Sequence, residues 1–357
     1  MEEIPYHELP NRISPQKRCV EHSRRLYFSD DLENPLPWGT QGKKGLPYET
    51  YTLALTSALI SEVFKPGQLT PEVLLDLNEA QKSGYLSGTM LQERFPDITT
   101  MGQYWIRSGI AGFQADAARH FYLPERYTDP FGNTTVLKYD ARDLFIESTT
   151  DPIGNVTRIE NFNYRVMAPD RMFDFNEKKA EVIFVILGMP TAAAVMGKGE
   201  EADNLTGLNE ALIHPDLETV IRYFTEAYDE TSSRNLLATA TSRNLYYFGE
   251  RIEPDGSIIY GHHPACAAGL VREKHLMQEG ETPSPLQVGF EYSDGSGNVI
   301  VTKKQAEPER DGLALRWLAN GKTILNNKGK PVKQYEPYFS PVGHQYEEPE
   351  EVGVTPI

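Results

Sequence analysis

The sequence carries Asp129-Pro130-Phe131-Gly132-Asn133-Thr134-Thr135 and, 22 positions later, Asp151-Pro152-Ile153-Gly154-Asn155-Val156-Thr157. In this pattern an aspartate can accept backbone hydrogen bonds, a proline fixes φ, and a glycine can adopt a positive φ. A type I turn followed by a bulge in a β-hairpin needs residues with these properties. We therefore predict structural repeat turns at Asp129, Pro130, Gly132, Asn133, Asp151, Pro152, Gly154 and Asn155.

The pattern continues along the chain in weaker form. A decayed third copy is Asp174-Phe175-Asn176-Glu177-Lys178, and looser relatives occur at 255–257, 294–298 and 327–330. The residues after the first turn alternate and favour β-structure, so that Thr135, Leu137 and Tyr139 would share one face of a strand. One hairpin cannot bury its apolar side alone, and repeated hairpins are therefore expected to pair edge to edge into a long antiparallel sheet. The predicted fold class is mainly β with helical insertions (α+β).

Three regions follow from the same patterns. Residues 1–47 are rich in proline and charge and are expected to form an extended connector. Residues 48–119 are expected to form a helical lead-in, with helices at 48–64, where apolar residues recur every four positions, at 72–83, and a short one at 85–95. Residues 120–357 are expected to form the β-repeat region, interrupted by a helical insertion at about 209–230, where apolar residues from Leu217 to Tyr228 follow helical spacing.

Composition excludes several classes of function. The chain has 35 Lys+Arg against 51 Asp+Glu, a net charge of −16, which argues against a sequence-independent nucleic-acid binder and against a polybasic membrane-surface protein. We find no apolar run long enough to span a bilayer and expect no direct membrane insertion. The first residues are acidic and lack the apolar stretch of a signal peptide, so secretion would follow a non-classical route.

We find no catalytic motif, and we expect neither an enzyme nor a cofactor. His262, His263 and Cys266 could suggest a metal site, but neighbouring strand residues point to opposite faces and no fourth ligand stands nearby. Cys19 and Cys266 are expected to be free thiols. Each aspartate turn offers only one carboxylate to calcium, which favours the turn interpretation. A glycan-binding or glycoside-hydrolase β-scaffold remains an alternative, because acidic residues abound and aromatic residues cluster at 246–248 and 335–339.

Several segments together resemble the Rhs/YD-repeat proteins, and in particular the middle to C-terminal region of the B component of bacterial insecticidal toxin complexes (Tc toxins). The segments are His120–Asn133, Lys138–Asp140, Thr150–Asn155, Asn163–Met167, Leu187–Thr191, Ala194–Gly199 and Asn326–Ser340. They span roughly residues 100–357 in the order that the family shows.

The resemblance implies a function. In that family the B and C components form a hollow cocoon, a β-sheet strip wound around a toxic polypeptide, and a propeller of the B component docks on the membrane-translocating A component. This chain would supply a non-enzymatic segment of the shell, with a C-type partner and an A-type component as its partners. The propeller, the Rhs core signature and the self-cleaving aspartyl site are not recognisable here, so we expect a fragment of a larger protein that aggregates or oligomerises alone. The stalk of another Rhs polymorphic toxin is a further alternative.

Overall fold

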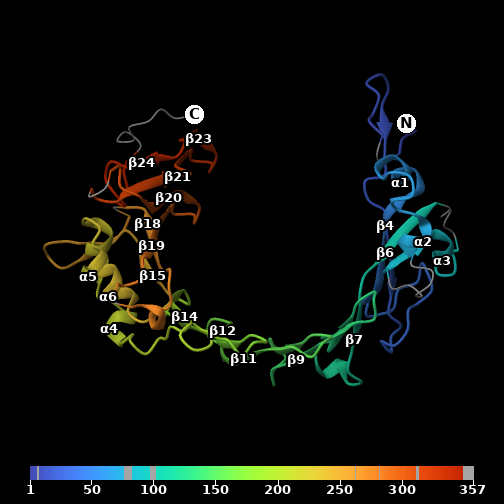
Figure 1. Ribbon diagram of the computed structural model, residues 1–357, viewed down its shortest axis with the longest axis horizontal. Helices are drawn as coiled ribbons and strands as arrows, with labels where there is room; N and C mark the ends of the chain where they lie inside the picture. Colours follow the sequence, from blue (N-terminus) through green and yellow to red (C-terminus); the bar gives the residue numbers. More distant parts are fainter. Residues whose placement is uncertain are drawn as a thin grey trace. The chain divides into compact units, whose positions relative to one another are not determined.

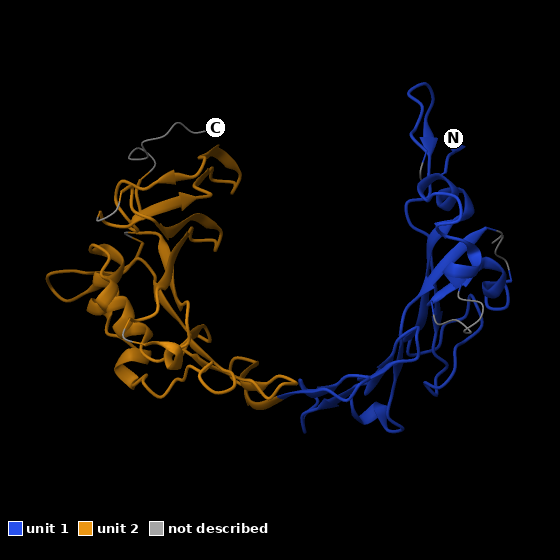
Figure 2. Cartoon of the chain, viewed as in Figure 1, with its two compact units in different colours: residues 1–158 blue, residues 159–357 orange. Residues whose placement is uncertain are grey.

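The computed structural model describes residues 1–5, 8–75, 83–96, 102–261, 263–280, 282–310 and 313–348 (Figure 1). The chain divides into two compact units, residues 1–158 and 159–357 (Figure 2). The fold is mainly β with few helices and contains a large antiparallel sheet of 14 strands. Residues 76–82 of the predicted helix at 72–83, His262, and the end of the predicted β-repeat region beyond residue 348 lie outside the described residues.

A four-stranded antiparallel sheet organises the first half of unit 1. Its hydrogen-bonded order is β3 (Ser23–Tyr27), β4 (Pro47–Thr56), β6 (Gln103–Arg107) and β5 (Tyr85–Ser87). The short helices α1 (Ser57–Val63), α2 (Pro71–Leu75) and α3 (Gly88–Leu91) lie between these strands in the chain. Tyr51, Trp105 and Phe95 are fully buried in its core. A separate parallel pair, β1 (Glu2–Glu3) and β2 (Gln16–Lys17), comes first in the chain.

The helix predicted at 48–64 is wrong for its first half, which forms strand β4. The four-residue spacing that suggested a helix is overridden because β4 pairs with β3 on one side and with β6 on the other. The helix begins only at Ser57, where the Thr56 side chain caps it by accepting from the Leu59 N–H at 3.1 Å. The short helix predicted at 85–95 is likewise reduced to α3, since 85–87 form β5. Strand β3 lies within the predicted connector.

The rest of unit 1 is a run of hairpins. It contains β7 (Ile110–Gly112), a 3-10 turn at Ala117–Arg119, β8 (Arg126–Thr128), β9 (Thr134–Tyr139) and β10 (Ile146–Thr150), and β11 (Val156–Asn163) begins in unit 1 and ends in unit 2. These strands are antiparallel neighbours in chain order. The predicted pairing of the strands that follow Asn133 and Asn155 into one antiparallel sheet is thus confirmed. Strands β8 to β11 contain no buried residue.

Unit 2 begins with further hairpins, and a hydrophobic core forms around its later strands. Its strands of the large sheet are β12 (Ala168–Phe173), β13 (Lys179–Phe184), β14 (Pro190–Met196), β15 (Ser242–Tyr247), β18 (Ala265–Arg272), β19 (Leu286–Ser293), β20 (Val299–Ala306), β21 (Arg316–Asn320) and β24 (Tyr338–Phe339). Two small hairpins stand apart, β16 (Arg251–Ile252) with β17 (Ile258–Ile259) and β22 (Thr323–Leu325) with β23 (Pro331–Gln334). A second 3-10 turn spans Leu276–Gln278.

Three helices of the insertion supply one side of the unit 2 core. They are α4 (Glu210–Ile213), α5 (Leu217–Thr225) and α6 (Glu230–Leu237). The helix expected from the apolar spacing of Leu217 to Tyr228 is confirmed over Leu217–Thr225 as α5, which begins where Asp216 accepts from the Thr219 N–H at 2.7 Å and ends before Glu226. Helix α6 extends the insertion beyond 230. Aromatic and aliphatic side chains of the helices pack with those of β15 and β18–β21. In the described ranges we find no helix long and apolar enough to cross a membrane.

Candidate functional site

The first copy of the repeated pattern forms a tightly hydrogen-bonded turn between β8 and β9. The Asp129 N–H donates to the Asn133 carbonyl oxygen at 2.8 Å, and the Gly132 N–H donates to the Asp129 carbonyl oxygen at 3.0 Å. Asp129 Oδ1 accepts from the Phe131 and Asn133 N–H groups, and Oδ2 accepts from Asn133 Nδ2 at 3.0 Å. Gly132 has φ of 86°, a backbone conformation that residues with a Cβ rarely adopt.

The second copy repeats these contacts between β10 and β11. Asp151 Oδ1 accepts from the Ile153 N–H at 3.0 Å and from the Asn155 N–H at 2.9 Å, and Oδ2 accepts from Asn155 Nδ2 at 2.8 Å. Gly154 has φ of 91°. The prolines stand at the second position of each turn, at Pro130 and Pro152. The eight residues singled out in the sequence therefore lie in two turns of the same geometry.

Both turn aspartates are stabilised as carboxylates. The side-chain hydrogen bond from Asn133 lowers the pKa of Asp129. Burial acts to raise the pKa of Asp151, but hydrogen bonds from Asn155 outweigh it and the pKa is again lowered. Because each carboxylate accepts three hydrogen bonds from its own turn, we interpret both carboxylates as groups that stabilise the turn conformation.

The same two backbone bonds recur at five hairpins of unit 2. In each, the first N–H donates to the fifth carbonyl and the fourth N–H donates to the first carbonyl; the turns are 174–178, 185–189, 253–257, 294–298 and 326–330. The fourth residue has a positive φ in all of them, and it is glycine except at Glu177, with φ of 61°. Sequence reasoning missed the turn at 185–189, because its first residue is Val185 and only Gly188 signals it.

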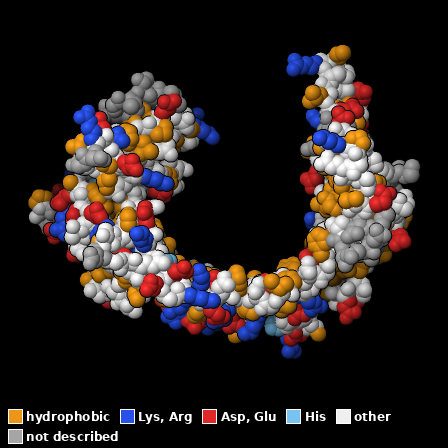
Figure 3. Space-filling view, viewed as in Figure 1, with side chains coloured by type: hydrophobic (Ala, Val, Ile, Leu, Met, Phe, Trp, Pro, Cys, Tyr) orange, Lys and Arg blue, Asp and Glu red, His pale blue; other side chains and the backbone are white. Residues whose placement is uncertain are grey.

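Charged side chains of both signs alternate on the strands between these turns. Figure 3 shows basic and acidic side chains next to each other over β12 and β13. There Arg171 contacts Glu160 at 3.0 Å and Glu181 at 2.6 Å. Since opposite charges lie close together, this part of unit 2 presents no extended basic stripe of the kind that binds phosphate backbones.

A buried ion pair that sequence reasoning missed joins β20 to the segment 338–348. Lys303 and Glu347 are both fully buried, and the Lys303 ammonium donates to the Glu347 carboxylate. The ammonium also donates to Ser340 Oγ at 2.8 Å and to the Gly343 carbonyl at 3.3 Å, and Tyr338 donates its hydroxyl to Glu347. Burial lowers the pKa of Lys303. Strand alternation could have placed Lys303 on the inner face with Val301, but not its partner.

His344 lies under the same segment among aromatic rings. Its ring centroid is 4.4 Å from that of Phe290 and 5.4 Å from that of Trp317, and its Nε2 lies 3.3 Å from the Tyr223 carbonyl oxygen. Burial, with a smaller contribution from the Lys303 charge, lowers the pKa of His344 to about 4. The imidazole is therefore neutral at pH 7.

Two buried arginines fasten the helical insertion to the sheet. Arg243, on β15, donates to the Thr191 carbonyl at 2.8 Å and to the Ile213 carbonyl at the end of α4 at 3.3 Å. Arg272, on β18, donates to the Ala240 carbonyl at 2.7 Å, and Asp203 lies 3.6 Å from its Nε. These cations replace the water that would otherwise solvate helix-end and loop carbonyls.

The cysteines and histidines considered as ligands do not converge. Cys19 is exposed and Cys266 is buried, and both are free. Burial raises the pKa of the Cys266 thiol. His262 lies outside the described residues, and within the described ranges no group of three or more His, Cys, Asp or Glu side chains is placed to hold a metal ion.

Comparison with known proteins relates the fold to toxin complexes. No protein-family model matches the chain, and no curated protein matches its sequence. The crystal structure of TcdB2-TccC3 matches 89% of the chain with a TM-score of 0.58 and 18% identity. The Tc holotoxin pore of Photorhabdus luminescens matches 89% with a TM-score of 0.60 and 17% identity. The matched region makes up 14% and 16% of those two chains. The chain thus has the fold of a segment found in Tc toxin structures.

Proposed function

We propose that this chain is a non-enzymatic wall segment of the shell in an insecticidal toxin complex, of the Rhs/YD-repeat type found in B components. The observation that carries the proposal is a series of five hairpin turns with the same two backbone hydrogen bonds, at 129–133, 151–155, 174–178, 185–189 and 294–298, each of which joins two neighbouring strands of the large antiparallel sheet. Each added hairpin lengthens such a sheet without changing its local chemistry. The likeness in fold to TcdB2-TccC3 supports the same interpretation.

The open faces of the hairpin strands also support a wall. Strands β8 to β11 bury no side chain, so the sheet there is a single layer without a core of its own. Most sheets bury at least one face against another layer. A single layer is suited to separating two spaces, one of which would contain a toxic polypeptide.

The partners and location follow from this role. We propose that a C-type component supplies the enclosed polypeptide and that an A-type component carries the assembly to the target membrane. The protein would be made in the bacterial cytoplasm and released by a non-classical route. No metal or cofactor is part of the proposed function.

Protease protection of the enclosed polypeptide tests the proposal. The chain would be produced with its C-type partner in the native bacterium, and the assembly would be digested with trypsin. We expect the passenger polypeptide to survive much longer than the same polypeptide alone. Equal digestion rates would contradict the shell function.

Two variants connect the result to the turns. Gly132→Val with Gly154→Val places a β-branched residue where φ is 86° and 91°, which we expect to disturb strand pairing and shorten protection. Ile153→Ser is the matched control, since that side chain is 85% exposed at the tip of the second turn and its loss leaves the backbone unchanged. Equal loss of protection in both proteins would contradict the role of the turns. Binding to a glycan array instead would support a glycan-binding scaffold.

A further inference from the structure

Among the residues that the structure describes, no strand pairs with the outer edge of β7. It is the last strand in the order of the large sheet, and in the described part of the chain its strand partner is β8. In the β8–β9 hairpin, Asp129 donates to Asn133, and alternation then directs the backbone groups of Arg126 and Thr128 toward β7. Their partners in β7 are Gly112 and Ile110. The N–H and carbonyl of Ala111, between them, therefore point to the outer edge.

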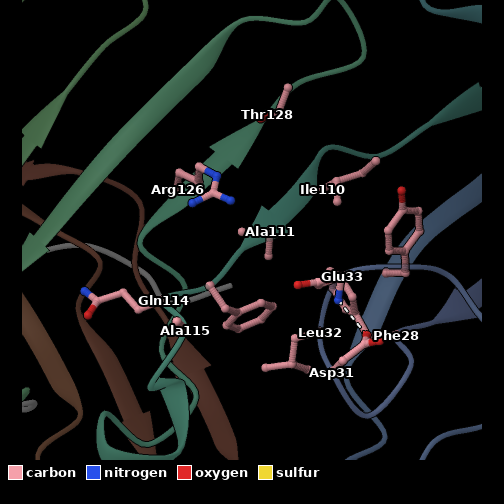
Figure 4. Close-up of a pocket in the computed structure, with 13 residues that line it drawn as sticks. Phe28, Asp31, Leu32, Glu33, Ile110, Ala111, Gln114, Ala115, Arg126 and Thr128 are labelled. Atoms are coloured by element: carbon pink, nitrogen blue, oxygen red, sulfur yellow. Dashed lines mark hydrogen bonds between the residues drawn. The ribbon is translucent and has the colours of Figure 1, made fainter.

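A cavity of about 570 Å³ lies along this edge. Residues of the stretch Ile110–Ala115 line one side of it, and residues of the loop 28–33 line the other (Figure 4). Tyr48 also lines the cavity. Two residues before β7, the Ser108 N–H donates to the Thr50 carbonyl at 2.8 Å. The cavity is thus a slot between a strand edge and a loop, all within unit 1.

The lining of the slot combines aromatic rings with carboxylates. The ring of Phe28 lies 4.8 Å from that of Tyr48 and 5.4 Å from that of Phe113. Asp31 and Glu33 belong to the facing loop, and the Glu33 N–H donates to Asp31 Oδ1 at 3.0 Å (Figure 4). Aromatic faces together with carboxylates attract cations.

The slot has an excess of negative charge. Its cation, Arg126, is neutralised by an ion pair with the neighbouring Glu125. The carboxylates of Asp31 and Glu33 are left to bind a further cation. A hydrogen bond from the Ser29 hydroxyl lowers the pKa of Asp31, so its carboxylate is charged at neutral pH.

We propose that the edge of β7 binds an extended polypeptide of another protein, which adds a strand beside Ala111 and places a lysine or arginine side chain between Asp31, Glu33 and the aromatic rings. Main-chain hydrogen bonds provide affinity in this mode of recognition, and side-chain pockets provide specificity. We take the length of the bound segment as about six residues from the six consecutive residues Ile110–Ala115 that line the slot. The inference does not rest on the shell function, because it concerns unit 1 alone.

Peptide titration tests the proposal. The probe is a capped octapeptide that alternates threonine and valine around one central arginine, and the matched peptide carries glutamate in place of the arginine. We expect the arginine peptide to bind to the full chain at least tenfold more tightly, with an affinity that weakens as salt is added. Two further versions of the arginine peptide carry N-methyl groups, one at the odd-numbered and the other at the even-numbered residues. Each version blocks the N–H groups along one edge of the peptide strand, so only one of the two should still bind.

Variants of the chain identify the carboxylates. Asp31→Asn with Glu33→Gln keeps the size and the acceptor oxygens but removes the charge, and we expect about tenfold weaker binding of the arginine peptide. Glu62→Gln, an exposed change on α1, is the control and should leave the affinity unchanged. Circular dichroism checks that each variant is folded.

Four results would overturn the proposal: equal affinity for the arginine and glutamate peptides, no saturable binding by about 1 mM peptide, unchanged affinity in the double variant, or loss of binding in neither N-methylated version. The chain could also sediment as a dimer that the arginine peptide fails to dissociate. That result would overturn the proposal and assign the edge of β7 to a second copy of this chain.

Discussion

The neutral His344 makes the stability of unit 2 depend on pH in a predictable direction. In the folded chain its pKa is lowered to about 4, because it is buried against Phe290 and Trp317. In the unfolded chain the pKa returns to about 6.5. Between these values the unfolded chain binds the proton and the folded chain does not, so stability is complete above pH 6.5 and is lost as the pH falls toward 4.

The size of the effect follows from the two pKa values. A shift of one unit corresponds to about 1.4 kcal/mol, and the difference of about 2.5 units limits the loss to roughly 3 kcal/mol. At pH 5, where the unfolded chain is almost fully protonated at this site, we expect a loss of about 2 kcal/mol relative to pH 7. Carboxylates also titrate in this range, and the prediction therefore concerns the difference between the wild-type chain and variants that lack the imidazole.

Urea unfolding at pH 7 and pH 5, followed by hydrogen–deuterium exchange of peptides from β19 to β21, measures this difference. The variants are His344→Phe, which retains an aromatic ring, and His344→Gln, which retains a polar group. Between pH 7 and pH 5, the free energy of unfolding of both variants should fall by about 2 kcal/mol less than that of the wild-type chain. If all three chains respond equally to pH, or if NMR titration gives the imidazole a pKa near 6.5, the reasoning is refuted.

Three further predictions concern a buried charge, a strained turn and the thiols. Lys303→Met removes the ion-pair partner of the buried Glu347 carboxylate and should lower the free energy of unfolding of unit 2 by about 3–5 kcal/mol. Lys138→Met, at an exposed ion pair, should change that of unit 1 by less than about 1 kcal/mol, and urea titration distinguishes the two effects. Glu177→Gly relieves a left-handed backbone at φ of 61° and should slow hydrogen exchange of β12 and β13, with a gain of about 0.5–1 kcal/mol. Cys19 should react with a thiol reagent in the native chain and Cys266 only after unfolding, so two fast thiols in native buffer would contradict the burial.

The hairpin turns could be predicted because their chemistry is local. The five residues 129–133 contain all the groups that form the hydrogen bonds of their turn. The same argument works for helix α5, whose cap and apolar stripe lie within one segment. It fails for β4, because the partners that make it a strand are residues 23–27 and 103–107.

The buried ion pair and the slot could not be predicted for a related reason. Lys303 and Glu347 are 44 residues apart, and a lysine in a strand pattern gives no sign of its partner. The slot brings the loop at 28–33 against residues 110–115, which the sequence separates by more than 75 positions. Contacts of this kind arise from the topology of the sheet.

Electron cryo-microscopy of the chain purified with its native partners is the most direct test of the proposed shell function. The account predicts that strands β8 to β14 are part of a continuous antiparallel wall, with density for a polypeptide on one side of it. A chain that copurifies with no toxin-complex component, or whose hairpin strands pack as an isolated domain with no enclosed polypeptide, would contradict it.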